Sequence, residues 1–332
     1  MIELVVKKIN DGQKSLKFLK KYLSDAPLSF IYSIFRKKDF KVNGHWVKND
    51  YVLKEGDVVR IYVTGQQIKD FSTPKKVEAR PFPYPITYED NNVLIVDKPS
   101  GVLVTGDKNN HGKTLVQAVL NYLYQKKEYD PEHSTFSPSP AHRLDRNTAG
   151  LVIFGKNDQS LKALEELFKE RDNLVKEYAA LVKGKLDKPV VINVSLYKDE
   201  NKGQVYVRSI EKGGKEAITE VKPIVFNDDF SLVKCHLVTG RTHQIRVHLA
   251  HIGHPLIGDQ KYGDFALNKK MEKQFQIRNQ FLHSITLGFK DVPPVLKELK
   301  NKTFHSSLTD KEKRILSILF KQDKIMASED LI

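Results

Sequence analysis

Hydrophobic residues near the start of the chain recur first at helical spacing and then at strand spacing. Leu16, Leu19 and Leu23 lie three and four residues apart with lysines between them, which predicts an amphipathic helix. Ser29 is the expected cap of a second helix. The elements predicted here, in chain order, are helices over 16–23 and 30–38, a tight Asn-Gly turn at 43–44 and a strand over 58–63. We therefore expect a compact unit over residues 1–66.

The stretch 67–85 is polar and proline-containing, which is typical of a linker. From residue 86 onward, apolar strand-like runs and helical stretches interleave irregularly, which favours an α+β fold. We place a larger domain at 86–332, with a charged amphipathic helix at about 308–325 packed against it. Its other predicted elements are helices over 114–124 and 160–169 and strands over 92–96, 151–154, 178–182, 204–207, 218–226, 231–238 and 285–289.

The net charge of the chain indicates which kind of molecule it binds. The chain has 332 residues and a formal net charge of +14. Residues 1–80 hold 17 lysine and arginine residues against 9 acidic ones, so a quarter of the chain supplies more than half of the excess. An excess of this size favours a polyanionic partner, with nucleic acid ahead of a membrane.

The compartment is inferred from cysteine usage and from apolar runs. Cys235 is the single cysteine, which excludes an intrachain disulfide and fits a reducing compartment. The first residues lack the basic-then-apolar order of a signal peptide, and no apolar run is long enough to span a bilayer. We expect a cytoplasmic monomer that does not bind a membrane.

The sequence His-Arg-Leu-Asp-Arg-Asn-Thr-Ala-Gly at 142–150 is the strongest candidate for chemistry. It places one carboxylate, Asp145, between the cations Arg143 and Arg146, directly before an apolar strand. Neighbouring cations favour the charged form of a carboxylate. Such a group acts as a nucleophile or a base, or forms an ordinary ion pair, and the residues alone leave these interpretations open.

A second polar cluster, 239–258, reads Thr-Gly-Arg-Thr-His-Gln-Ile-Arg-Val-His-Leu-Ala-His-Ile-Gly-His-Pro-Leu-Ile-Gly. Its pattern predicts a helix or a strand that presents Arg246 on one side. A guanidinium is always charged and its planar fork matches a carboxylate. Arg246 is therefore a candidate partner that holds Asp145 charged and oriented.

These strings resemble the motifs of the RluA-type pseudouridine synthases. Residues 142–150 are similar to the second motif of that family, with Ala149 in place of the usual serine, and 239–263 are similar to the third. Residues 92–101 resemble the first motif, whose role looks structural, and Leu282-His283-Ser284 matches the closing segment. The family places a tyrosine in a Tyr-x-Ala strand, which corresponds here to Tyr178.

The resemblance implies a fold and an activity. It implies a mixed, largely antiparallel catalytic sheet flanked by helices, and conversion of uridine to pseudouridine in structured RNA, most often large-subunit ribosomal RNA, without a cofactor. Asp145 would attack the sugar or the base, or abstract a sugar proton, while Arg246 pairs with it and Tyr178 stacks on the base. Arg143 would fill the place of the flipped-out uridine. Other candidate RNA contacts are His142, Arg241, His243 and Gln244.

The segment 1–66 resembles an αL RNA-binding domain of the ribosomal-protein type. The resemblance rests on the order Ser-Phe-Ile-Tyr, Arg-Lys-Lys, Val-Asn-Gly and Leu-Lys-Glu-Gly-Asp. It implies an RNA clamp that adds affinity through phosphate contacts. The basic residues expected to contact RNA are Lys17, Lys21, Arg36, Lys37, Lys38 and Lys41.

Other features of the sequence suggest a metal site, an ATP-binding loop or a non-catalytic RNA-binding protein. The histidines at 243, 248, 251 and 254 fit no standard zinc spacing, so we expect no metal site. The stretch 106–114 has five residues between its glycines, where an ATP-binding P-loop has four. A non-catalytic RNA-binding or ribosome-assembly factor would not need Asp145, Tyr178 and Arg246 together. Transfer RNA remains an alternative substrate.

Overall fold

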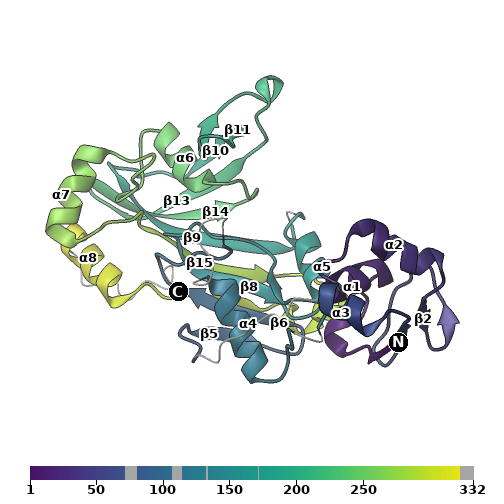
Figure 1. Cartoon of the computed structure of the whole chain (residues 1–332). Helices are drawn as coiled ribbons and strands as arrows, with labels where there is room; N and C mark the ends of the chain where they lie inside the picture. The colour runs from purple at the N-terminus through teal and green to yellow at the C-terminus, as the bar shows by residue number, and fades with distance from the viewer. Residues whose placement is uncertain (72–80, 107–113, 132–133, 171, 322–332) are drawn as a thin grey trace.

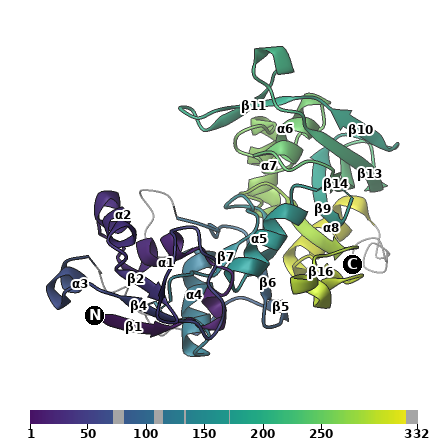
Figure 2. The same cartoon turned by 90° about the vertical axis from the view of Figure 1, so that its right-hand side faces the viewer.

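The structure is a computed structural model that describes residues 1–71, 81–106, 114–131, 134–170 and 172–321. They form a small N-terminal unit and a larger domain built on one extended sheet (Figure 1). Figure 2 shows the N-terminal unit beside α4 and α5 of the larger domain. The predicted linker lies partly outside the described residues, at 72–80.

The large domain is organised by a mixed sheet. Within the described residues, ten strands join in this sheet, and its central order is β10-β13-β14-β9-β15-β8-β6-β5. The strands are β5 (Ile86–Glu89), β6 (Val93–Lys98), β7 (Ser139–Pro140), β8 (Ala149–Gly155), β9 (Leu174–Lys183), β10 (Val190–Asn193), β13 (Ile218–Phe226), β14 (Phe230–Leu237), β15 (Leu282–Phe289) and β16 (Thr303–His305). Among their pairings, β15 with β8 is parallel and the others are antiparallel. The α+β prediction with a largely antiparallel sheet is confirmed.

Helices cover both faces of this sheet. They are α4 (Leu115–Gln125), α5 (Asp158–Leu167), α6 (Gln244–His251), α7 (Phe265–Phe275) and α8 (Asp310–Phe320), with the 3-10 turns η2 (Ile210–Lys212) and η3 (Pro294–Leu299). Successive strand residues point to opposite faces. Leu94 and Val96 of β6 accordingly pack in the cluster that contains α4, whereas Val93 and Ile95 pack in the cluster that contains α5. Coverage on both faces explains why β6 and β8 are apolar runs without alternation.

A short hairpin projects beside α6. Its strands, β11 (Leu196–Asp199) and β12 (Gln204–Val207), form a separate two-stranded sheet (Figure 1). Leu196 and Val205 pack with Ala217 and with Val247 of α6, so the hairpin base is anchored near the segment 239–258. The sequence predicted β12 but not β11.

The small unit has its own hydrophobic core. Within the described residues, its sheet has the order β1-β4-β2-β3. Its elements are β1 (Ile2–Val5), η1 (Lys8–Asn10), α1 (Ser15–Tyr22), α2 (Leu28–Arg36), β2 (Phe40–Val42), β3 (His45–Trp46), β4 (Val58–Ile61) and α3 (Gly65–Phe71). Phe18, Phe35 and Phe40 are buried together in its core. The two predicted helices, the 43–44 turn and the later strand are confirmed.

Two local expectations for this unit differ from the structure. Helix α2 begins at Leu28 directly after Pro27, and it has no side-chain cap, so Ser29 is not its cap. The fixed φ of proline is compatible with a helix start, which explains why a polar cap is dispensable here. The segment predicted as linker begins with helix α3, because Ile68 and Phe71 pack against the core of the unit.

A buried polar seam joins the two parts. The Thr135 hydroxyl donates to Gln13 Oε1 at 2.6 Å, and the backbone N–H of Phe136 donates to Asn10 Oδ1 at 3.1 Å. All four residues are buried. Since buried polar groups are costly unless they are paired, these bonds favour one placement of the small unit on the large domain.

Two lysines predicted to contact RNA, Lys17 and Lys21, also have partners at this seam. Lys17 Nζ pairs with Asp158 Oδ1 at 2.5 Å, and Asp158 begins helix α5 of the large domain. Lys21 Nζ lies 5.3 Å from the ring centroid of Phe136. Both cations have partners across the seam, and the Lys17 side chain remains 46% exposed.

A close approach of two strands fixes the start of β8. Gly150 has φ +107°, and a Cβ there would lie 2.1 Å from the backbone oxygen of Ser284 in β15. Only glycine permits this approach, since real carbon–oxygen contacts are longer. The parallel contact of β8 with β15 therefore depends on this residue.

We expect Gly150→Ala to lower the free energy of unfolding by about 2–4 kcal/mol, because a clash with backbone adds to an unfavourable φ. Gly101→Ala is the matched control, since Gly101 also has a positive φ but has open space around its Cβ position. The control should lose only about 1 kcal/mol. Urea denaturation measures both, and equal losses would contradict the close-packing explanation.

Candidate active site

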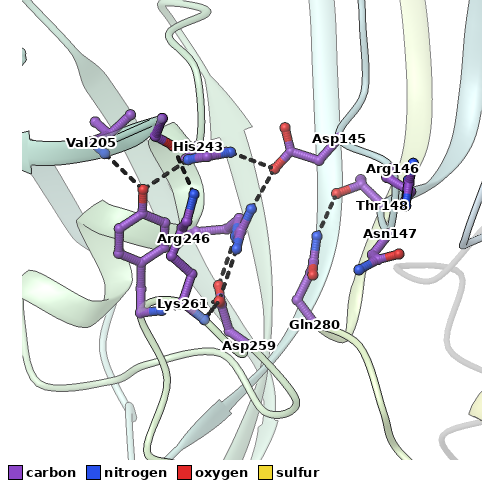
Figure 3. A network of polar contacts seen from close by, with 12 residues as sticks. Asp145, Arg146, Asn147, Thr148, Val205, His243, Arg246, Asp259, Lys261 and Gln280 are labelled. Atoms are coloured by element: carbon purple, nitrogen blue, oxygen red, sulfur yellow. Dashed lines mark hydrogen bonds and ion pairs between the residues drawn. The ribbon is translucent and has the colours of Figure 1, made fainter. Parts of the chain in front are cut away.

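Asp145 lies in the loop that leads from β7 to β8. Its side chain is 27% exposed, so it is accessible from solvent. The loop is fixed by a turn in which Thr148 N–H donates to the backbone oxygen of Asp145, and by Gln280, whose amide donates to the Thr148 hydroxyl (Figure 3). The loop therefore holds the candidate carboxylate on a fixed support with one side open to solvent.

Arg246 connects Asp145 to a second carboxylate. Its Nη1 donates to Asp145 Oδ2 at 2.8 Å, while its Nε and Nη2 donate to the two oxygens of Asp259 at 2.7 and 2.9 Å (Figure 3). Burial opposes the charge of Arg246, but the hydrogen bonds and charge of Asp259, with a further contribution from Asp145, raise the pKa of the guanidinium. The predicted pairing of Arg246 with Asp145 is present in the structure.

Asp259 is a functional residue that the sequence interpretation missed as a partner of Arg246. It is almost fully buried and also accepts hydrogen bonds from the backbone of Lys261 and Tyr262. Burial acts to raise its pKa, but the hydrogen bond and charge of Arg246 outweigh that and hold the pKa below its usual range. The available signal was its position just after the second cluster, inside the stretch 239–263 that resembles the third family motif.

Tyr178 of β9 lies in the same region. Its ring is largely buried, and strand β9 pairs Tyr178 with Ser284 of β15. Burial raises the pKa of Tyr178 to about 12, with a hydrogen bond to Ser284 acting in the opposite direction and the charge of Asp145 adding to the rise. The hydroxyl is therefore protonated at neutral pH, and Tyr178 lies near enough to Asp145 for that charge to act on it.

Lys98 ties the first motif to the loop of Asp145. Its Nζ is buried and donates to the backbone oxygens of Pro99, Val102 and Arg146, at 3.0, 3.0 and 3.1 Å. Burial lowers the pKa of Lys98 to about 8, while the charges of Asp145 and Asp97 act to raise it. An ammonium group with three carbonyl partners holds this loop in place, which is a structural role for residues 92–101.

Two predicted RNA contacts, His142 and Gln244, have partners within the protein. The ring of His142 stacks on Phe168 at 4.5 Å between centroids and accepts a hydrogen bond from the Ile153 N–H. Burial lowers the pKa of His142 to about 3, with the charge of Lys176 contributing, so it stays neutral. Gln244 is buried, and its amide bonds to the hydroxyls of Thr239 and Thr219 and to the backbone of 218 and 241. His142 is half-buried and Gln244 is buried, and contact of either residue with RNA stays a prediction.

The remaining predicted contacts lie near or at the surface. Arg143 and Arg241 are exposed, and Arg241 Nε donates to the backbone oxygen of Glu216. His243 directly precedes α6, and its Nε2 lies 3.8 Å from Asp145 Oδ2. Arg146, which we expected beside Asp145, is exposed and extends away from Arg246 in Figure 3.

The structure contains no group of three potential metal-ligating side chains among the residues it describes. His248 bonds through its two ring nitrogens to Thr219 and to the backbone of Val194, and His254 bonds to the backbone of Lys183. His248 and His254 therefore hold helix α6 and the segment that follows it against the neighbouring strands. The glycine-containing stretch 106–114 lies mostly outside the described residues. Across the described part of the chain, no helix is both long and apolar enough to cross a membrane.

Comparisons with known proteins agree with this arrangement. The family model described as RNA pseudouridylate synthase matches residues 92–251. The chain is 33% identical over 283 residues to "Ribosomal large subunit pseudouridine synthase C" of Vibrio cholerae, covering 84% of this chain and 85% of that protein. It is 34% identical over 282 residues to the protein of the same name from Haemophilus ducreyi, covering 84% of each.

A solved structure supports the fold. The structure titled "Human RNA Pseudouridylate Synthase Domain Containing 4" matches 68% of this chain and 88% of its own, with 23% identity and a TM-score of 0.50. From these similarities, the chain belongs to the RNA pseudouridylate synthase family, the isomerases that convert uridine in RNA to pseudouridine, as its RluA-type motifs predict.

Arg246→Lys should abolish most of the activity while the fold persists. A lysine has one ammonium group and cannot donate to both oxygens of Asp259 and to Asp145 in the same geometry. We expect the rate of the chemical step to fall by at least about 100-fold. Single-turnover assays on RNA measure it, and Arg314→Lys, at an exposed position of α8 outside the site, is the control that should keep its activity. Wild-type rates for Arg246→Lys would contradict the bridging role.

Proposed function

We propose that this chain converts specific uridines of large-subunit ribosomal RNA to pseudouridine, with Asp145 acting on the target nucleotide. The supporting observation is that Asp145 is exposed to solvent and yet held by Arg246, whose other donors are anchored on buried Asp259. The named relatives give the substrate class, since both are ribosomal large-subunit enzymes by name.

The reaction requires the glycosidic bond to break and the base to rejoin its sugar through carbon. In one route Asp145 attacks the sugar or the base, and in the other it removes a proton from the sugar. Both routes need the carboxylate of Asp145 in a fixed position, and the hydrogen bond from Arg246 Nη1 supplies that position. Tyr178 presents a neutral phenol beside Asp145, so its ring stacks on the base and its hydroxyl assists the final proton transfer.

Arg143 is the proposed residue for base flipping. It is exposed and precedes Asp145 by two positions on the same loop. A target uridine must leave its helix to reach Asp145, and a guanidinium plane next to that carboxylate replaces the missing stack.

Asp145→Asn should lose turnover and keep RNA binding. An amide of the same shape neither attacks nor accepts a proton, and it preserves the local packing. The measurement is tritium release from RNA labelled at carbon five of uridine, using ribosomal and transfer RNA transcripts, with filter binding in parallel. Asp291→Asn, which removes a highly exposed carboxylate elsewhere, is the control. Turnover by Asp145→Asn would exclude the proposed role, and tritium release from transfer RNA alone would change the substrate class.

We also propose that the N-terminal unit is an αL-type RNA clamp. Lys17 and Lys21 are occupied at the seam, but Arg36, Lys37 and Lys38 are exposed at the end of α2. Two exposed aromatic rings accompany the cations: Lys38 Nζ lies 5.4 Å from the Trp46 ring centroid, and Lys41 Nζ lies 5.2 Å from that of Tyr62. Cations beside exposed aromatic rings fit phosphate contact combined with base stacking.

The triple variant Arg36→Gln, Lys37→Gln, Lys38→Gln should weaken RNA binding and flatten its salt dependence. Each lost phosphate contact lowers the slope of log K against log salt by about 0.7–0.9. The control removes the same number of charges from the large domain, through Lys297→Gln, Lys300→Gln and Lys302→Gln. The measurement is binding at several salt concentrations. An equal slope for the triple variant and wild type would rule out this surface as the clamp.

A further inference from the structure

His243 holds an unusual position beside the reactive carboxylate. Its backbone has φ +53°, a left-handed conformation directly before helix α6. From there its ring reaches two partners: Nδ1 lies 2.8 Å from the hydroxyl of Tyr262, and Nε2 lies 3.8 Å from Asp145 Oδ2 (Figure 3). The ring therefore lies between Tyr262 and Asp145. The roles assigned so far to Asp145, Arg246 and Tyr178 do not explain this position of His243.

The proton positions in this bridge follow from counting donors. The Tyr262 hydroxyl accepts a hydrogen bond from the backbone N–H of Val205 in β12, at 2.9 Å. It has one proton left to give, and His243 Nδ1 is the neighbouring acceptor. When Nδ1 accepts, the ring proton sits on Nε2 and faces Asp145. In the opposite tautomer, an Nε2 lone pair would face the carboxylate oxygen, which is repulsive.

The charge of the ring is set by its surroundings. Burial is the largest effect and lowers the pKa of His243. The charge of Asp145, and to a smaller extent that of Asp259, acts to raise this pKa, whereas the charges of Arg246 and Lys261 lower it further. These groups face the ring from the Asp145 loop, from helix α6 and from the segment after α6. Burial likewise raises the pKa of Tyr262, which therefore keeps its proton. A neutral ring and a protonated phenol are the two conditions that the bridge needs.

We propose that His243 is a positioning residue for Asp145: it is neutral, carries its proton on Nε2, and Tyr262 fixes that tautomer. Arg246 Nη1 and His243 Nε2 both approach Oδ2, so this oxygen is the anchored one. Figure 3 shows the other oxygen of Asp145 turned away from both donors, and we assign it to the substrate. The proposal refines the site of the proposed function and rests on it for the kinetic part of the test.

The tautomer is measured on the protein without substrate. Nitrogen-15 NMR of histidine-labelled protein distinguishes protonated from unprotonated ring nitrogens, and the His243 signals are assigned by their loss in His243→Gln. We expect Nε2 protonated and Nδ1 unprotonated at neutral pH in wild type, and loss of this single tautomer in Tyr262→Phe. A proton on Nδ1, or a doubly protonated ring, in the wild-type protein would overturn the proposal.

Kinetics separate positioning from simple packing. The amide nitrogen of glutamine can reach the place of Nε2, whereas that of asparagine reaches only the place of Nδ1. Asparagine tolerates a left-handed backbone well, so a defect in His243→Asn cannot be ascribed to backbone strain. At saturating RNA we expect His243→Asn to lower the single-turnover rate about 10- to 100-fold, because Asp145 loses the polar group that faces its Oδ2. His243→Gln should stay within about 5-fold of wild type, and RNA binding should not change.

The role of Tyr262 is tested by a double-mutant cycle. Tyr262→Phe should lower the rate about 10-fold in the wild-type background and cause no further loss in His243→Asn, since both changes remove the same contact. Thermal unfolding of each variant checks that the fold persists. Equal losses in His243→Gln and His243→Asn, or additive losses in the cycle, would overturn the proposal. An inactive wild type on every RNA would instead refute the proposed function, while the NMR result would still decide the tautomer.

Discussion

One guanidinium shared between two carboxylates organises the functional end of this molecule. Arg246 donates two hydrogen bonds to buried Asp259 and one to partly exposed Asp145. The first pair is a fork-to-carboxylate contact in a buried setting, where removal of one partner leaves an uncompensated charge and is strongly destabilising. The second contact costs little because the cation is already in place. A buried structural ion pair thereby supplies a preorganised charge to Asp145, the residue proposed to act on the target nucleotide.

The sheet delivers these groups from distant parts of the chain. Asp145 precedes β8, Tyr178 belongs to β9 and Arg246 to α6, and β15 lies between β8 and β9. The parallel contact of β15 with β8 needs the bare backbone of Gly150, and the buried ammonium of Lys98 secures the loop on its other side. Rigid strands on both sides explain how a short, partly exposed loop holds a carboxylate in one orientation.

Asp145, Arg246 and most of the strands could be predicted from the sequence because the patterns that mark them are local. Asp145 and Arg246 lie in long, ordered motifs, and most strands are apolar runs that burial on both faces explains. The partnership of Arg246 with Asp259 was missed because it depends on a loop folding back through space. The protein partners of His142 and Gln244 could not be predicted, because polarity alone does not separate a surface residue from one that is hydrogen-bonded inside the fold. Helix α3 was taken for linker because its two anchoring residues contact a core formed much earlier in the chain.

The seam between the two parts gives the basic surface of the small unit a defined place. Asn10 and Gln13 find their partners at Thr135 and Phe136, and Ile9 and Phe136 are buried in the core of the large domain. If the two parts separated, water would replace these hydrogen bonds with little change in free energy. Apolar side chains would also become exposed to water, so the joined arrangement is favoured. The cations at the end of α2 then lie at a fixed position relative to Asp145. An RNA that contacts both surfaces meets a preorganised pair, and less binding free energy is lost to ordering the protein.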